Sequence, residues 1–83
     1  MKYLFTDSAR KDIAKLDSRA VDKIQKTLTI YLADPLKYAK KLIHSSIGTY
    51  RFKIGDYRVI FDIEGQDIIV LRVGHRQSIY RKR

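Results

Sequence analysis

The 83-residue sequence contains no cysteine, which excludes disulfide bonds and thiolate metal sites. Its two histidines, His44 and His75, lie far apart in the sequence with no cluster of carboxylates beside them, so we expect no metal ion. No glycine-rich phosphate-binding motif is present, and we therefore expect no nucleotide cofactor. No apolar run approaches the ~20 residues that span a bilayer, and the N-terminus lacks the apolar stretch of a signal peptide. These absences predict a soluble, cytoplasmic protein with no membrane partner.

Acidic residues are scarce relative to basic ones. Nine Asp and Glu stand against eighteen Lys and Arg, which gives a formal net charge of +9. The excess is concentrated in residues 37–83, where eleven basic residues stand against four acidic ones. Such a segment repels itself and attracts polyanions, although a high charge also serves solubility. The charge favours nucleic acid, the ribosome or an acidic protein as the partner.

The length and composition indicate a single globular domain over residues 1–83. The hydrophobic fraction of 45% is normal for a folded protein, so the chain is not expected to be disordered. A chain of this size buries only a modest core, and its stability should be about 3–8 kcal/mol.

The first half of the sequence predicts one strand and two helices. Residues 1–6 are typical of a short strand, and Thr6 or Asp7 can cap a helix that starts directly afterwards. A second helix should follow the cap pair Asp17-Ser18, because apolar residues recur there every three to four positions until Pro35. Two helices joined so closely form a helical hairpin. The basic segment that follows, "LKYAKKLIHSSIG", has only a weak helical signal.

From Thr49 the apolar residues recur at every second position, which predicts strands. The segments "TYRFKI", "YRVIFDI" and "DIIVLRV" are separated by the turn sequences Gly-Asp and Glu-Gly-Gln, so they should form a three-stranded antiparallel meander. The whole order is β-α-α-β-β-β. It indicates an α+β domain, in which the helical hairpin packs on one face of a small antiparallel sheet.

A two-residue turn at Gly55-Asp56 fixes the register of the first hairpin. Lys53 then lies opposite Arg58, and Arg51 shares their face, while the other face of the hairpin is apolar and should contact the helices. Like charges directly opposite one another are destabilising. No acidic residue interrupts these three cations before Asp62, so we interpret the face as a phosphate-binding surface.

The C-terminal residues 72–83 add five basic residues, a histidine and a tyrosine, with no acid. We expect Gly74 to turn the chain at the end of the last strand, so that His75, Arg76 and Tyr80 lie across or beside the sheet. The tail should be a helical turn or extended. A tyrosine among arginines can stack on a nucleic-acid base, although a basic tail is more often simply solvated.

The side chains available suit one reaction in particular, the cleavage of RNA by its own 2′-hydroxyl. Preplaced cations stabilise the negative charge that gathers on the phosphorane. Lysine, tyrosine or histidine can then transfer the two protons involved, provided that neighbouring groups adjust their pKa values.

The segment "YRFKIGDYRVIFDIEGQDIIVLRVGHRQSIYR" resembles the RelE-type toxins of the RelE/ParE toxin–antitoxin superfamily. The resemblance is close over about the last 35 residues, and the β-α-α order of the first half also fits. It implies a compact toxin that enters the ribosomal A site and cleaves mRNA there as a metal-independent endoribonuclease. It also implies an antitoxin partner, with an amphipathic or acidic segment, that wraps the toxin and neutralises it.

The resemblance also assigns roles to individual residues. The matching positions are the basic residues of the second strand (Arg51 and Lys53), a phosphate clamp (Arg58), a residue that assists the leaving group (Arg76) and a tyrosine that stacks on a base (Tyr80). Thr49 stands where some members carry a further lysine, and no glutamate occupies the position of a carboxylate base. The proton acceptor therefore stays open between Lys53 and Arg51, with His75 as a further accessory candidate.

Three other functions compete with mRNA cleavage. A ParE-like toxin would inhibit DNA gyrase without cutting RNA, although such relatives tend to lose the basic residues and tyrosine that this sequence keeps. A degenerate member of the superfamily would bind an antitoxin and do little else. A nucleic-acid-binding protein outside the superfamily would also carry this charge.

Overall fold

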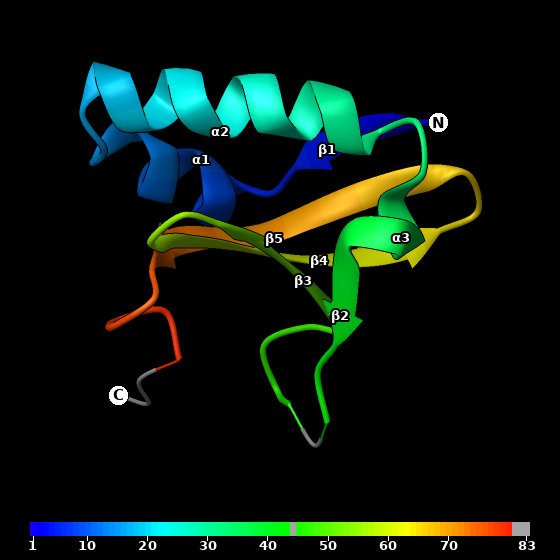
Figure 1. Ribbon diagram of the computed structural model, residues 1–83. Helices are drawn as coiled ribbons and strands as arrows, with labels where there is room; N and C mark the ends of the chain where they lie inside the picture. The colour runs from blue at the N-terminus through cyan, green and yellow to red at the C-terminus, as the bar shows by residue number, and fades with distance from the viewer. Residues whose placement is uncertain (44, 81–83) are drawn as a thin grey trace.

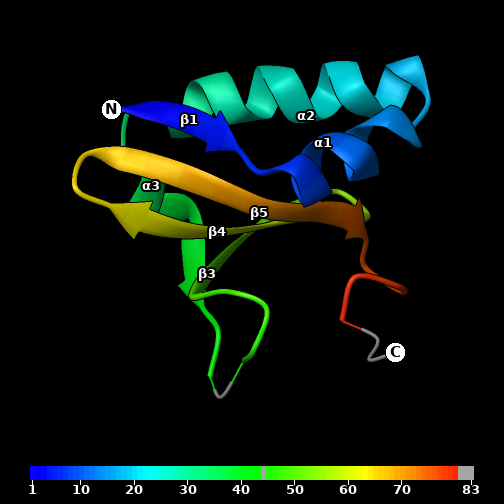
Figure 2. The same cartoon turned by 180° about the vertical axis from the view of Figure 1, so that it is seen from behind.

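The computed structural model describes residues 1–43 and 45–80, and its helices and strands form two layers (Figure 1). The elements follow the chain in the order β1 (Lys2–Phe5), α1 (Asp7–Ala14), α2 (Ser18–Tyr31), α3 (Pro35–Tyr38), β2 (Ala39–Lys41), β3 (Tyr50–Ile54), β4 (Tyr57–Glu64) and β5 (Asp67–His75). Helices α1 and α2 lie on one side of the sheet. The segment between β2 and β3 and the turn after β5 lie on the other side, as the front and back views both show (Figures 1 and 2).

Both long helices begin at the capping residues that the sequence indicated. The Thr6 side chain accepts a hydrogen bond from the backbone N–H of Ala9 at 3.1 Å, so Thr6 rather than Asp7 caps α1. The Asp17 carboxylate accepts from the N–H of Ala20 at 2.8 Å and caps α2 in the same way. Each cap satisfies one of the N–H groups that a helix start leaves unpaired. The helical hairpin is therefore confirmed.

The predicted meander is also confirmed, since β3, β4 and β5 are neighbouring antiparallel strands. The complete sheet is larger than expected, with the order β1-β5-β4-β3-β2. β1 pairs with β5 in parallel, so the sheet is mixed, and the expectation of an antiparallel sheet holds only from β2 to β5. The weak helical signal of the basic connector corresponds to the short α3, whereas the edge strand β2 within it was not anticipated by the sequence analysis.

The hydrophobic core lies between the helical hairpin and the sheet. Its fully or almost fully buried members come from α1, α2, β3, β4 and β5, and they are Ala9, Ile24, Leu28, Phe52, Ile54, Val59, Phe61, Ile68, Val70 and Val73. Phe52 and Phe61 are in contact across the β3–β4 pair, with ring centroids 4.4 Å apart. The apolar face of the hairpin thus packs against the helices, as the alternation in its sequence predicted.

The opposite face of the sheet is covered in part by residues 45–49, which precede β3. Gly48 lies directly over the sheet, where an added Cβ would come within 2.6 Å of the Ile60 side chain and 2.9 Å of Leu71. The backbone N–H of Thr49 donates to the Asp62 carboxylate at 2.7 Å and fastens the end of this segment. Ile60 is fully buried as a result. None of the helices in the described residues is long and apolar enough to cross a membrane.

Candidate functional site

The β3–β4 hairpin has the register that the sequence predicted. Gly55 adopts a φ of +59°, which a side chain would oppose, and the tight turn pairs Lys53 with Arg58 directly across the strands. Arg51 lies two residues before Lys53 and therefore shares its face. Lys53 is exposed and Arg51 is half-buried. The structure thus brings Arg51, Lys53 and Arg58 together on the face of the sheet away from α1 and α2. We call this surface the cationic face.

Arg58 differs from the expectation of an open side chain, since only 7% of it is exposed. Its Nη1 donates to the carbonyl oxygens of Gly55 and Tyr57, each at 2.9 Å, and so holds the turn from within the sheet. Gly74 stands opposite Arg58 on β5, and Ile79 folds back onto Gly74. The chain after β5 therefore closes over this part of the face, which an analysis of strand alternation alone does not reveal.

The other edge of the Arg58 guanidinium stays available. Its Nε and Nη2 make no hydrogen bond within the described residues, and no side-chain nitrogen or oxygen there is both buried and unpaired. Nε and Nη2 form the paired N–H edge with which an arginine can bind an anion in bidentate fashion. Arg72 uses the same two atoms toward the Asp12 carboxylate, at 2.7 and 3.0 Å.

Arg76 contacts the same turn as Arg58. Its backbone N–H donates to the carbonyl oxygen of Asp56 at 2.7 Å, and its Nε lies 3.7 Å from the Asp56 carboxylate. The ion pair is long and well exposed, so it orients Arg76 without neutralising it strongly. Arg58 contacts Gly55 and Arg76 contacts Asp56, so these two predicted cations both lie at the turn end of the hairpin.

Tyr80 ends the part of the tail that the structure describes. The N–H of Ile79 donates to the carbonyl oxygen of His75 at 2.9 Å, so the chain after β5 makes a single helical turn. Ile79 is buried, whereas the next residue, Tyr80, is 44% exposed. The Tyr80 side chain is therefore accessible to solvent. The last three residues of the predicted basic tail, 81–83, lie outside the described residues.

His75 is not brought to this face. It pairs with Tyr57 on β4, and neighbours in a strand pair point to the same side of the sheet, which here is the helix side. The two rings contact edge to face, with centroids 5.9 Å apart. The Nδ1 atom of His75 also accepts a hydrogen bond from the N–H of Gln77 at 3.1 Å. His75 therefore contacts Tyr57 on the helix side of the sheet and accepts a hydrogen bond from the backbone of the turn that follows β5.

One further cation on this face was missed by the sequence analysis. Lys40 on β2 stands directly opposite Arg51 on β3, so it shares the face of Arg51 and Lys53. The strand that carries it has only three residues, Ala39–Lys41, which are too few for a period-two pattern to be recognised. Lys40 is exposed.

A second missed feature is the ion pair between Asp12 on α1 and Arg72 on β5. The Asp12 carboxylate also accepts the backbone N–H of Val73 at 2.9 Å, beyond the point where β1 stops pairing with β5. Burial alone would raise the pKa of Asp12, but the hydrogen bonds from Arg72 and Val73 and the charges of Arg72 and Lys15 lower it below its ordinary value. The same contact raises the pKa of Arg72. The ion pair therefore holds α1 against the part of β5 that lies beyond its pairing with β1. There the Asp12 carboxylate, rather than a neighbouring strand, accepts the backbone N–H of Val73.

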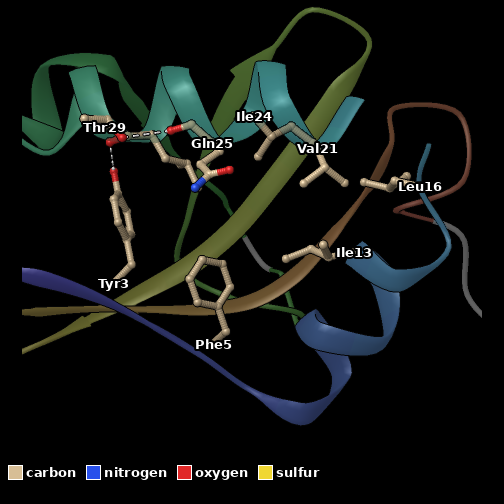
Figure 3. A pocket seen from close by; sticks show the side chains of 9 residues that line it. Tyr3, Phe5, Ile13, Leu16, Val21, Ile24, Gln25 and Thr29 are labelled. Carbon is tan, nitrogen blue, oxygen red and sulfur yellow. Dashed lines mark hydrogen bonds between the residues drawn. The ribbon is translucent and has the colours of Figure 1, made fainter. Parts of the chain in front are cut away.

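The helix side of the sheet carries a different kind of feature, an apolar cavity of about 260 Å³ between β1 and the two helices (Figure 3). Tyr3 and Phe5 form its floor, and Ile13, Val21 and Ile24 approach it from the helices. The Tyr3 hydroxyl donates to the carbonyl oxygen of Leu28 at 2.6 Å, and burial raises its pKa to about 12. The cavity offers no charged group, so it does not belong to the cationic face.

No group of three or more His, Cys, Asp or Glu side chains within residues 1–43 and 45–80 is arranged to hold a metal ion. The chemistry available on the cationic face is instead that of guanidinium and ammonium groups around a shared turn.

A family model described as the ParE toxin of the type II toxin–antitoxin system parDE matches residues 3–80. The chain belongs to the RelE/ParE superfamily of type II toxins.

Two curated toxins are similar to this toxin over almost their whole length. RelG from Mycobacterium tuberculosis is 33% identical, and the alignment covers 94% of this chain and 93% of RelG. RelE3 from Methanocaldococcus jannaschii is 31% identical, with 96% of each chain covered. The relatives named for RelE therefore match the helical half of the toxin as well as its strands.

Two solved structures confirm the fold. The M. tuberculosis toxin–antitoxin complex RelBE2 contains a chain with a TM-score of 0.81 and 29% identity, covering 90% of the toxin and 96% of that chain. The RelB–RelE antitoxin–toxin complex from Methanococcus jannaschii gives a TM-score of 0.72 and 28% identity, covering 93% and 94% respectively. Both neighbours thus come from complexes with an antitoxin.

Proposed function

We propose that this toxin is a ribosome-dependent endonuclease that cuts mRNA in the A site and thereby inhibits translation. The observation that carries the proposal is the hairpin register, in which Lys53 and Arg58 face one another and Arg51 shares their side of the sheet. Two like-charged residues placed directly opposite cost stability, which an anionic substrate would recover. The names of the RelE-type relatives support the same activity.

The proposed reaction is an attack of the 2′-oxygen on the adjacent phosphorus. The new P–O2′ bond forms as the P–O5′ bond breaks, which leaves a 2′,3′-cyclic phosphate and a 5′-hydroxyl. Arg58 binds the non-bridging oxygens through its Nε and Nη2 edge, because its Nη1 is already fixed to the turn. Such a preorganised cation stabilises the phosphorane without reorganising during the reaction.

Two proton transfers complete the reaction. Of the two candidates for the acceptor of the 2′-hydroxyl proton, a guanidinium is the poorer proton acceptor by its chemistry, so Lys53 rather than Arg51 is the proposed base. Arg76 stabilises the departing 5′-oxygen, which takes a proton from solvent and becomes a hydroxyl, while Lys53 returns the proton of the 2′-hydroxyl to solvent. Tyr80 stacks on a base beside the scissile phosphate. The cations supply the charge stabilisation, so we propose that the chemical step needs no metal ion bound to the toxin.

The proposed partners are the translating ribosome with its mRNA and a cognate antitoxin. The antitoxin is supported by the two similar structures, which are both toxin–antitoxin complexes. The net charge of +9 suits an antitoxin with an acidic or amphipathic segment.

The deciding experiment adds the purified toxin to a reconstituted translation reaction and maps the mRNA ends by primer extension. We expect new ends within A-site codons when ribosomes are present, and intact message when they are omitted. Uncleaved mRNA on translating ribosomes would contradict the proposal.

A second candidate function is inhibition of DNA gyrase. It is favoured by the description of the matching family model, which is that of a ParE toxin. A supercoiling assay with purified gyrase separates the two candidates. Loss of supercoiling together with intact mRNA would favour the ParE-like function, whereas cleaved mRNA with unaffected supercoiling would favour the nuclease.

A further inference from the structure

The cationic face does not end at the β3–β4 hairpin. Lys40 on β2 pairs with Arg51 on β3, and Lys53 on β3 pairs with Arg58 on β4. Arg51 and Lys53 are separated by one residue on the same strand. The four side chains therefore form a continuous series of nearest neighbours that crosses three strands, from Arg58 near the turn to Lys40 at the edge of the sheet.

The spacing within this series is regular. Residues directly opposite in an antiparallel pair have Cβ atoms about 5 Å apart, and residues two apart on a strand are separated by about 7 Å. Each step from Arg58 to Lys53, Arg51 and Lys40 is therefore of a similar size. Such a series matches a chain that carries one negative charge at each repeat, as the backbone of single-stranded RNA does.

None of the four cations forms an ion pair within residues 1–43 and 45–80. In the described part of the chain the ion pairs are those of Arg72 with Asp12 and of Arg76 with Asp56, and neither involves the series. The acid that follows Arg58 first on this face of β4, Asp62, accepts the backbone N–H of Thr49 and holds the segment over Ile60. Two like-charged cross-strand pairs lie side by side, each destabilising by a few tenths to about 1 kcal/mol.

We propose that Lys40 binds an mRNA phosphate next to the scissile one, so that the RNA backbone crosses the sheet from the Gly55-Asp56 turn toward the β2 edge. The ligand is the phosphate backbone of single-stranded RNA, and the contact is independent of base sequence. This inference rests on the proposed nuclease function and defines the substrate path on that face.

A solvated edge lysine is the competing explanation. Lysines on edge strands discourage association between sheets, and β2 is an edge strand. Lys41 would serve that purpose equally, since it is also exposed. However, Lys41 pairs with Tyr50, which packs against the core on the helix side, so it points away from the series. The adjacent lysine is therefore a matched control with the same charge on the opposite face.

The test measures single-turnover cleavage of mRNA on reconstituted translating ribosomes, with toxin concentration and salt both varied. We expect Lys40→Ala to raise the toxin concentration for half-maximal cleavage about two- to five-fold while leaving the maximal rate unchanged, as loss of one phosphate contact predicts. The dependence of log affinity on log salt should flatten by about 0.7. Lys41→Ala should match the wild type, and Lys40→Arg should restore tight binding.

The possible outcomes separate this inference from the proposed function. Cleavage by the wild type together with equal behaviour of Lys40→Ala and Lys41→Ala would overturn the inference alone, whether both variants are unchanged or both are weakened. A lower maximal rate in Lys40→Ala at unchanged half-saturation would also overturn it. Absence of cleavage by the wild type would overturn the proposed function and the inference together.

Discussion

The two faces of the sheet are built from alternate residues of the same strands, yet they are organised by different interactions. On the helix face, Phe52 and Val59 are fully buried among apolar neighbours. On the other face, away from α1 and α2, Arg51, Lys53 and Arg58 lie side by side. A register slip by one residue would exchange the two sets and bury the cations. The hydrophobic face therefore fixes where the cationic face lies. Along each strand, residues that stabilise the core alternate with residues that we propose to act on RNA.

The largest effect should separate two adjacent residues of β3. Phe52→Ala removes a fully buried ring and should cost about 3–5 kcal/mol, which approaches the whole stability of so small a domain. Lys53→Ala, on the exposed face, should change stability by no more than about 0.5 kcal/mol and should abolish mRNA cleavage. Urea denaturation followed by circular dichroism measures both free energies. Equal destabilisation by the two changes would show that the faces are not separated in this way.

Arg58 and Arg76 should affect cleavage similarly but stability differently. Loss of either cation should lower the cleavage rate constant about 10²- to 10³-fold, because the proposed mechanism uses each of them to stabilise developing negative charge. Arg76→Ala should leave stability within about 0.5 kcal/mol, whereas Arg58→Ala should cost a further 1–3 kcal/mol or so, since it removes two hydrogen bonds to the turn.

Single-turnover cleavage and thermal unfolding of the same preparations distinguish these two effects. The exposed Arg19 on α2 provides a control, and Arg19→Ala should change neither quantity. Cleavage at the wild-type rate by both Arg58→Ala and Arg76→Ala would count against the assignment of the cationic face.

The stability of the protein should be sensitive to one added methyl group at Gly48, in the segment before β3 that covers part of the sheet. Gly48→Ala brings a Cβ within 2.6 Å of the Ile60 side chain, which is fully buried, so the segment must move. We expect a loss of about 1–3 kcal/mol, as is usual for overpacking. Ser46→Ala, at an exposed position of the same segment, should be close to neutral. The unfolding midpoint in urea compares the two, and a neutral Gly48→Ala would mean that the segment yields freely.

The smallest effect concerns the sheet edge and its pH dependence. The folded state lowers the pKa of Asp12 below its ordinary value of 3.8, so its ion pair with Arg72 stabilises the protein fully above that value and progressively less as the pH falls through the lower folded value. The contribution should be at most about 1 kcal/mol, because Arg72 is well exposed. Urea titrations between neutral and strongly acidic pH should show this acid-dependent part in the wild type and not in Asp12→Asn. Asp22→Asn on α2 is the matched control, and retention of the acid dependence in Asp12→Asn would assign it to other carboxylates.

The sequence predicted those parts of the fold that depend on nearby residues. Thr6 and Asp17 cap their helices because a side-chain oxygen reaches an N–H three residues later. The pairing of Lys53 with Arg58 follows from two turn residues. The parallel pairing of β1 with β5 joins residues more than sixty positions apart, and β2 is too short for its alternation to be seen. Neither the pairing of β1 with β5 nor the existence of β2 could therefore be predicted from local patterns.

The sequence by itself determined that Arg51, Lys53 and Arg58 share one face, because strand alternation and a tight turn are local constraints. Only the tertiary structure decided how that face is completed. The return of the chain through β2 added Lys40 beside Arg51, and the turn after β5 covered Arg58 and brought Arg76 to Asp56. Those contacts form between segments distant in sequence, and they depend on how the helices and strands pack, which no short stretch of residues encodes.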